Sequence, residues 1–400
     1  MTRTLRITLA SVVVAFVAAC GGSSTPDPSD VQFVYTSDAH YGITRPSFRG
    51  AATVDAQLVN RALVAQINAI STATLPATDD AHPGALVGPI DFAVQTGDVS
   101  NRSQLISGTT YCQSAATSWG QFKADYLDGI TLRDPDGLPT PWFLVPGNHD
   151  VSNAIGFTKT LSPATDPTVL VEMFNRFMKP SVPVTSATYD YRTKKVLYSR
   201  DLHGIHFVFL NMWPDSAART WLATDLASVA AATPVIVFTH DEPPSESKHF
   251  TSTLTTSSTY DWTLKFENLL ADVFADSPVN TATANLVEQR SLVAFLKAHK
   301  NVVAYFHGNT NSSEFYDYTG PDADVALPTF RVDSPMKGTV SGVDAPDGIG
   351  DESKLSFMLV TIDTVGKKLT AREVLWNGTK AAGAPLAFGG QRTVSIAPPR

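Results

Sequence analysis

Residues Trp142–Asp150 read WFLVPGNHD, an apolar run that leads directly into a group of polar side chains. The same order, an apolar run and then polar residues, recurs at four other places in the chain. These places are 33–40 (FVYTSDAH), 92–98 (FAVQTGD), 235–240 (VIVFTH) and 302–311 (VVAYFHGNTN). Runs that are continuously apolar, rather than alternating, are typical of strands buried on both faces. We therefore predict five such strands, and a sixth over 207–210 (FVFL).

Helical patterns lie between these predicted strands. Val59, Leu63 and Ile67 recur at the spacing of one helix face, and the sequence places Asn60 and Arg61 outside that face. A second helical pattern over 292–296 precedes the strand at 302. Strands that alternate with helices favour an α/β fold built of layers. Near the end of the chain, 357–362 and 369–376 are predicted to form a closing hairpin.

The polar residues after the predicted strands include side chains that bind metal ions in proteins. Ligand sites in open α/β sheets form beyond the carboxyl ends of the strands, where the connecting loops converge. Carboxylate, imidazole and amide groups follow five of the predicted strands, in the segments 38–40, 97–98, 147–150, 240 and 307–311. Mixed nitrogen and oxygen ligands of this kind suit Zn, Fe or Mn. The sequence therefore predicts a divalent metal site at the strand ends.

Taken in order, four of these blocks resemble the calcineurin-like metallophosphoesterase superfamily. They are Asp38-x-His40, Gly97-Asp98, Gly147-Asn148-His149-Asp150, and a lone histidine after a strand, His240. The third block is the most specific, whereas Asp-x-His or Gly-Asp alone carries little information. The resemblance implies an α/β fold, specifically a four-layer α/β/β/α metallophosphoesterase sandwich of two mixed sheets.

The resemblance also implies two divalent metal ions as cofactors, with Mn, Fe or Zn expected, and a role for each matching residue. Asp38 and His40 would bind the first ion, Asn148 and His240 the second, and Asp98 would bridge both. His149 would not bind metal but would face the phosphate and assist the leaving oxygen. The implied reaction is hydrolysis of a small phosphate mono- or diester by a hydroxide that bridges the two ions. Asp98 and His149 are thus the predicted catalytic residues.

The fifth block departs from the superfamily pattern, which has Gly-His-x-His where this chain has Gly308-Asn309-Thr310-Asn311. Asn309 and Asn311 would each offer a metal an amide oxygen in place of an imidazole, so affinity should fall and the preference should move toward Mn or Mg. His307 could compensate as a ligand, or could be a packing residue at the strand end. The exchange leaves an alternative function open, a non-catalytic binding or scaffold protein on a degenerate metallophosphoesterase domain.

The first 30 residues have the composition of an export signal and a linker. Residues 1–20 combine two arginines with an apolar stretch that is too short for a comfortable membrane span. Val17–Cys20 resembles a bacterial lipobox, after which the signal is removed and Cys20 is lipidated; a plain signal peptide and an uncleaved anchor are the alternatives. Residues 21–30 would form a flexible tether. These features predict an exported, membrane-anchored bacterial lipoprotein that faces the periplasm or the cell exterior.

The composition excludes several other classes of protein. Of the 400 residues, 43% are hydrophobic and 17% charged, which excludes a wholly disordered chain. A net charge of −8 gives no sign of a nucleic-acid surface, and two cysteines exclude a disulfide framework. We expect one metallophosphoesterase domain over 31–376, polar insertions at about 71–90, 103–141 and 241–260, and a C-terminal tail over 377–400. The sequence does not indicate an oligomeric state.

Overall fold

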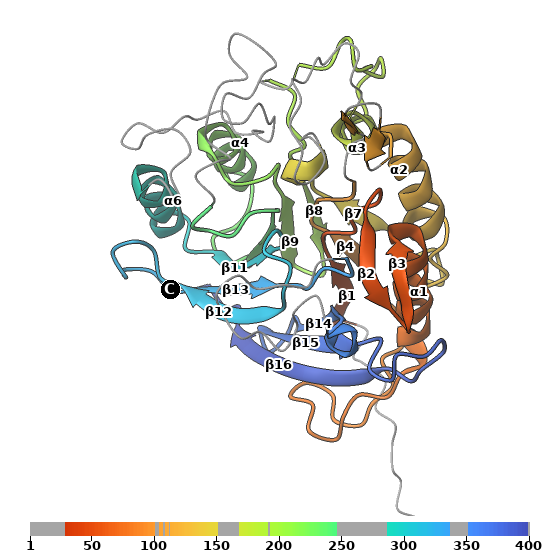
Figure 1. The fold of residues 1–400 in the computed structure, drawn as a ribbon. Helices are drawn as coiled ribbons and strands as arrows, with labels where there is room; N and C mark the ends of the chain where they lie inside the picture. Colours follow the sequence, from red (N-terminus) through yellow and green to blue (C-terminus); the bar gives the residue numbers. More distant parts are fainter. Residues whose placement is uncertain are drawn as a thin grey trace, which may run out of the picture.

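The structure, a computed structural model, contains two six-stranded sheets that lie face to face, with helices outside them (Figure 1). It describes residues 29–100, 113–150, 168–190, 193–245, 286–336 and 351–398, together with the backbone of two short strands, β5 (Gln104–Ile106) and β6 (Thr109–Tyr111). A small separate hairpin, β2 (Thr44–Phe48) and β3 (Ala51–Asp55), lies beside the first sheet. The site described below depends on the two large sheets.

The first sheet has the strand order β16-β15-β14-β1-β4-β7. Its strands are β1 (Val31–Thr36), β4 (Phe92–Gln95), β7 (Trp142–Leu144), β14 (Ser356–Asp363), β15 (Lys368–Leu375) and β16 (Ala387–Ser395). β1, β4 and β7 are parallel, whereas β14, β15 and β16 each run antiparallel to their neighbour. All six residues of β1 are buried, which explains why this segment is continuously apolar around its centre.

The second sheet has the strand order β12-β13-β11-β10-β9-β8. Its strands are β8 (Tyr198–Leu202), β9 (Ile205–Phe209), β10 (Val235–Phe238), β11 (Val302–His307), β12 (Glu314–Tyr318) and β13 (Leu327–Arg331). The four central strands, β9, β10, β11 and β13, are parallel, and the two edge strands are antiparallel. Both sheets are therefore mixed, as predicted.

Helices cover the outer face of each sheet. They are α1 (Ala56–Ala69), α2 (Ala115–Phe122) with the π-helical turn η2 (Lys123–Leu127), α3 (Val169–Met178), α4 (Ser216–Leu226) and α6 (Leu286–Ala298). Short 3₁₀ turns are η1 (Ile70–Thr72), η3 (Asn148–Asp150) and η5 (Glu352–Lys354). Leu222 of α4 and Val293 of α6 belong to one buried apolar cluster with Val237 of β10, while α1 contributes to the apolar cluster that includes the first sheet. Ser114 and Asp215 begin α2 and α4, since their side chains accept a backbone N–H of the first turn.

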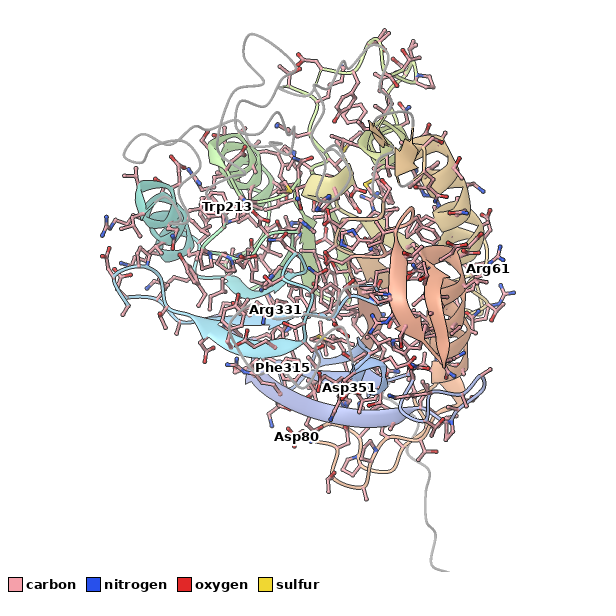
Figure 2. All side chains as sticks on the ribbon, in the orientation of Figure 1. Arg61, Asp80, Trp213, Phe315, Arg331 and Asp351 are labelled. Atoms are coloured by element: carbon pink, nitrogen blue, oxygen red, sulfur yellow. The ribbon has the colours of Figure 1, made fainter. Side chains whose placement is uncertain are left out.

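Aromatic rings join the two sheets. Phe33 of β1 contacts Phe238 of β10 and Phe306 of β11 edge to face, with ring centroids 5.6 and 5.7 Å apart. All three rings are fully buried. Side chains fill the space between the sheets and beneath the helices, and Trp213 lies within this packing (Figure 2). The sequence of layers, helix, sheet, sheet and helix, confirms the predicted four-layer α/β/β/α sandwich.

The structure corrects one expectation from the sequence and describes parts of two of the expected insertions. The tail expected over 377–400 is wrong at 387–395, where β16 pairs with β15 as an edge strand. The insertion at 103–141 contains α2 and η2. The insertion at 71–90 is fixed to the first sheet by a buried ion pair between Asp79 and Arg372, with Asp79 Oδ1 and Arg372 Nη2 2.7 Å apart.

Other parts of the prediction lie outside the described residues. These are the signal and tether as far as residue 28, with Cys20, and the greater part of the insertion at 241–260. Within the part of the chain that the structure describes, no helix combines the length and the apolar character needed to cross a membrane.

Candidate metal centre

Five loops meet at the carboxyl ends of parallel strands and bring the predicted site residues together. The loops follow β1, β4 and β7 in the first sheet, and β10 and β11 in the second. Backbone hydrogen bonds join the first two loops, since Asp38 N donates to Gly97 O at 3.0 Å and His40 N to Asp98 O at 2.9 Å. Gly308 N donates to His240 O at 3.0 Å and joins the two loops of the second sheet. The site therefore lies across the seam between the sheets.

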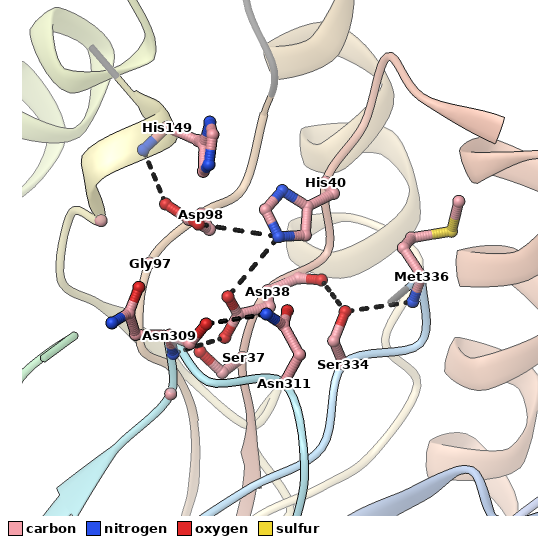
Figure 3. Close-up of polar contacts among 12 residues, drawn as sticks. Ser37, Asp38, His40, Gly97, Asp98, His149, Asn309, Asn311, Ser334 and Met336 are labelled. Atoms are coloured by element: carbon pink, nitrogen blue, oxygen red, sulfur yellow. Dashed lines mark hydrogen bonds and ion pairs between the residues drawn. The ribbon is translucent and has the colours of Figure 1, made fainter. Parts of the chain in front are cut away.

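Asp38, His40 and Asp98 form a buried group whose ligand atoms all lie within 4.8 Å of one another. His40 Nε2 is 3.5 Å from Asp38 Oδ1 and 3.6 Å from Asp98 Oδ2. Figure 3 shows the three side chains turned toward one another at the centre of the site. Two carboxylates and one imidazole at this spacing can hold a divalent cation.

A second group of ligand atoms shares Asp98 with the first. His240 Nε2 lies 3.4 Å from Asp98 Oδ1 and 3.1 Å from Asn148 Oδ1. The ring is held in place by its other nitrogen, Nδ1, which lies 2.7 Å from the carbonyl oxygen of Thr96. The two oxygens of Asp98 thus face different histidines, one toward His40 and one toward His240. This arrangement is the one required of a carboxylate that bridges two metal ions.

The buried charges of the site influence one another strongly. Burial opposes ionisation of Asp38, but its contact with His40 and the charge of His240 hold the pKa of Asp38 at about 2. Burial likewise opposes protonation of His240, but the Asp98 and Asp38 carboxylates raise the pKa of His240 to about 9. The site therefore creates a field that attracts positive charge. A metal cation would compete with the proton for His240, as expected of an imidazole ligand.

Two buried oxygens supply a test of whether these residues fit a metal ion. Asp38 Oδ1 and Asn311 Oδ1 are both buried and have no hydrogen-bond partner among the described residues. An acceptor oxygen without a donor is unfavourable in a protein interior, because its desolvation is not compensated. A cation between them would compensate both oxygens. The residues therefore fit a divalent metal ion.

His149 lies beside the ligand groups rather than within them. Its backbone N donates to Asp98 Oδ1 at 2.7 Å, and its ring packs edge to face on His40, with centroids 5.4 Å apart. The side chain is 7% exposed. The structure thus places His149 at the edge of the candidate centre, where the sequence predicted a residue that faces the substrate; that role stays a prediction.

Asn309 and Asn311 also lie at the centre. Asn309 N donates to Asp38 Oδ2 at 3.0 Å, and Asn311 lies next to Asp38 (Figure 3). His307 instead contacts Gly308 O and the hydroxyl of Tyr316 through its two ring nitrogens, at 3.1 and 2.8 Å. Burial, together with the charge of Arg331, holds the pKa of His307 well below its ordinary value. Of the two interpretations of His307, this geometry favours the packing residue.

Several buried residues that support the site were not singled out from the sequence. Asn60 of α1, expected outside the apolar face, is fully buried, and its Nδ2 donates to Ala39 O at 2.8 Å. Ser334, after β13, donates from Oγ to Asp38 O at 2.8 Å. Asp150 accepts from the backbone N of Gly147 and of Ser100, at 2.9 and 3.1 Å, and burial together with Asp98 raises the pKa of Asp150 to about 8. Of these three residues, only Asp150 could have been identified from the sequence, because it ends the Gly-Asn-His-Asp block.

Comparison with known proteins was made at the level of family and of fold. A family model described as calcineurin-like phosphoesterase matches residues 32–323. No curated protein matches the chain in sequence.

Three solved structures resemble the chain at low sequence identity. A dimetal phosphatase from Danio rerio has 10% identity and a TM-score of 0.44, over 86% of this chain and 95% of that one. The phosphopantetheinyl hydrolase PptH from Mycobacterium tuberculosis has 12% identity and a TM-score of 0.32, over 77% and 92% of the two chains. The calcineurin-like phosphoesterase YfkN from Bacillus subtilis has 10% identity and a TM-score of 0.32, over 92% and 91%.

Proposed function

Because the chain belongs to the calcineurin-like phosphoesterases, we propose that it hydrolyses phosphate mono- or diesters with two divalent metal ions at the candidate metal centre. The observation that carries the proposal is the position of Asp98, whose two oxygens face the two different groups of ligand atoms. A carboxylate placed in this way would be able to ligate one ion through each of its oxygens, as a site for two ions requires.

The first ion would be held by Asp38, His40 and Asp98, and the second by Asp98, Asn148 and His240. When bound, two such ions neutralise the phosphoryl oxygens and lower the pKa of a water molecule that can attack phosphorus. The protein keeps these ligands in place by burial and by the hydrogen bonds between loops described above.

His149 is the residue that we propose for proton transfer to the leaving oxygen. Its backbone N donates to the Asp98 carboxylate, which keeps the residue beside both groups of ligands. Its ring also packs on His40, which is itself a ligand of the first group. A positioned acid of this kind contributes about 10²–10⁴-fold to the rate.

Purified protein tests the proposal by metal analysis and by hydrolysis of p-nitrophenyl phosphate and bis-p-nitrophenyl phosphate. We expect about two ions per chain, and a loss of at least about 100-fold in kcat in His149→Ala at unchanged metal content. His299→Ala serves as the matched control and should keep wild-type activity, because His299 directly follows α6 and precedes the start of β11, whereas the site lies after the end of β11. A wild-type protein that binds no Mn, Fe, Zn, Ni or Mg and hydrolyses neither ester would instead support the non-catalytic binding protein.

We further propose that the mature chain is an exported lipoprotein anchored through Cys20, with the active site turned away from the membrane. Support comes from the N-terminal sequence and from the direction of β1. The linker joins the folded part just before Val31, at the start of β1, whereas Asp38 follows the other end of the same strand. The chain therefore enters β1 at the end opposite to the metal centre, which supports an active site turned away from the anchor.

A further inference from the structure

The loop after β11 carries two amide side chains, and each has its NH₂ group bonded to another group of the chain. Asn309 Nδ2 donates to Glu242 Oε2 at 3.2 Å. Asn311 Nδ2 donates to the carbonyl oxygen of Asn309 at 2.7 Å. Both asparagines border the metal centre next to Asp38 (Figure 3). Each NH₂ group therefore has a specific acceptor that helps to orient its amide.

The chemistry of these acceptors decides which atom each amide presents to the site. An ionised carboxylate and a backbone carbonyl can only accept hydrogen bonds, so each can bond only the NH₂ half of an amide. The amide oxygen, Oδ1, then points away from that acceptor. Asn311 shows the result, because its Oδ1 is buried and has no hydrogen-bond partner among the described residues. It lies close to Asp38, whose Oδ1 is in the same condition.

With these amide oxygens included, each metal position has three oxygen donors and one imidazole. Asn311, whose Oδ1 lies close to Asp38, would join Asp38, His40 and Asp98 at the first position. Asn309, which the resemblance then leaves for the other ion and whose Nδ2 bonds Glu242 two residues after His240, would join Asp98, Asn148 and His240 at the second. Imidazole suits Zn, Fe, Ni and Cu, whereas carboxylate and carbonyl oxygens suit Mg and Mn. Mn²⁺ and Mg²⁺ also take about six ligands, and Zn²⁺ is commonly satisfied with four. A donor set with three oxygens therefore favours the harder ions.

Glu242 is placed to control the second of these positions. It is half-buried, lies two residues after His240, and accepts from Asn309 and, at 3.5 Å, from the hydroxyl of Thr310. Carboxylates that orient a ligand in this way raise metal affinity about 10–100-fold in other metal sites.

We propose that Glu242 is a positioning residue that turns the Asn309 amide oxygen toward the second metal, and that it thereby makes this centre select Mn²⁺ or Mg²⁺ over Zn²⁺. The proposal rests on the proposed function in one respect, the presence of two metal positions. It goes beyond that function because it assigns the ion preference to a residue that is not itself a ligand.

The test measures metal binding rather than activity. Metal-stripped full-length protein is titrated with Mn²⁺ and with Zn²⁺ by calorimetry, for the wild type, Glu242→Ala and Glu242→Gln. We expect Glu242→Ala to lower the affinity for the second Mn²⁺ at least tenfold. The affinity for the first Mn²⁺ should stay within about threefold of the wild type, because, of the two loop amides, Glu242 bonds that of Asn309. The affinity for Zn²⁺ should fall less than the affinity for Mn²⁺, so the preference for Mn²⁺ should decrease. Glu242→Gln keeps an acceptor oxygen but loses the charge. Its affinity for the second Mn²⁺ should lie between those of the wild type and Glu242→Ala.

Glu373→Ala is the matched control. Glu373 is also a half-buried glutamate, and its Oε2 accepts a hydrogen bond from Gly390 N at 3.0 Å, but it lies on β15. The Glu373→Ala variant should bind Mn²⁺ and Zn²⁺ as the wild type does. If Glu242→Ala binds Mn²⁺ as tightly as Glu373→Ala, the role of Glu242 is refuted, even where the wild type binds two ions and hydrolyses esters. If the wild type binds no second ion, the proposed function itself fails.

Discussion

Replacement of Gly308 by alanine should damage both the stability of the fold and the first metal position. A Cβ at Gly308 would lie well inside van der Waals contact with both Ser37 Oγ and Asp38 Oδ2. One methyl group forced into a packed interior costs about 1–3 kcal/mol of unfolding free energy. Asp38 must move to relieve the contact, so we expect Mn²⁺ affinity at the first position to fall at least tenfold.

The same substitution in α2 gives a control with the opposite sign. Gly120 lies inside α2 and has no atom within 4 Å of the position its Cβ would take. Gly120→Ala should therefore raise the unfolding free energy by about 0.5–1 kcal/mol, because alanine favours a helix. Urea unfolding at equal m-values measures both changes, and calorimetry measures Mn²⁺ binding. Wild-type Mn²⁺ affinity in Gly308→Ala would refute the close approach of this loop to Asp38.

Three further predictions concern the ligands, the first sheet and the anchor. Asn309→His combined with Asn311→His should tighten Zn²⁺ binding by calorimetry, and unchanged affinity would mean that these positions are not ligands. Asp79→Ala should cost about 3–5 kcal/mol in urea unfolding, since it leaves the buried Arg372 guanidinium unpaired. Burial opposes ionisation of Asp79, but Arg372 lowers the pKa of Asp79 below its ordinary value of 3.8. In the wild type the stabilisation from this ion pair is therefore complete at neutral pH and is lost as the pH falls below that value. Cys20→Ser should move the protein from the membrane fraction to the soluble fraction on cell fractionation, and an unchanged distribution would contradict lipid anchoring at Cys20.

The central strands could be predicted from the sequence because they are buried on both faces. The run 235–238 coincides with β10, and the helical pattern around Val59 lies within α1. Central strands of parallel sheets carry an uninterrupted apolar signal that needs no knowledge of their partners. The polar residues that follow them could be predicted to converge for the same reason, since the carboxyl ends of parallel strands meet at one edge.

The remaining features depend on contacts between distant segments, which a local pattern does not contain. β16 includes Gly389 and Gly390 and is mostly exposed, so its sequence resembles a loop until β15 supplies a partner strand. Asn60 is polar and was expected on the solvent side of α1, but the carbonyl of Ala39 gives it a buried partner. Glu242 could not be linked to Asn309 from sequence, because 67 positions separate them.

The backbone of the site explains how its ligands can change without loss of the fold. Asp38, His40, Asp98, Asn309 and Asn311 have φ angles of 55°, 45°, 51°, 65° and 63°, all in the left-handed region. Most residues adopt this region only at a cost of about 1–3 kcal/mol, but asparagine, aspartate and histidine occur there several times more often than other non-glycine residues. The same three residue types supply oxygen and nitrogen ligands for divalent ions. If Asn309 and Asn311 bind the ions as proposed, an exchange of histidine for asparagine at these positions would alter the donor atoms while the loop conformation stays accessible. A β-branched residue would instead disfavour the loop conformation. The proposed ion preference could then change at these two positions while both sheets keep their packing.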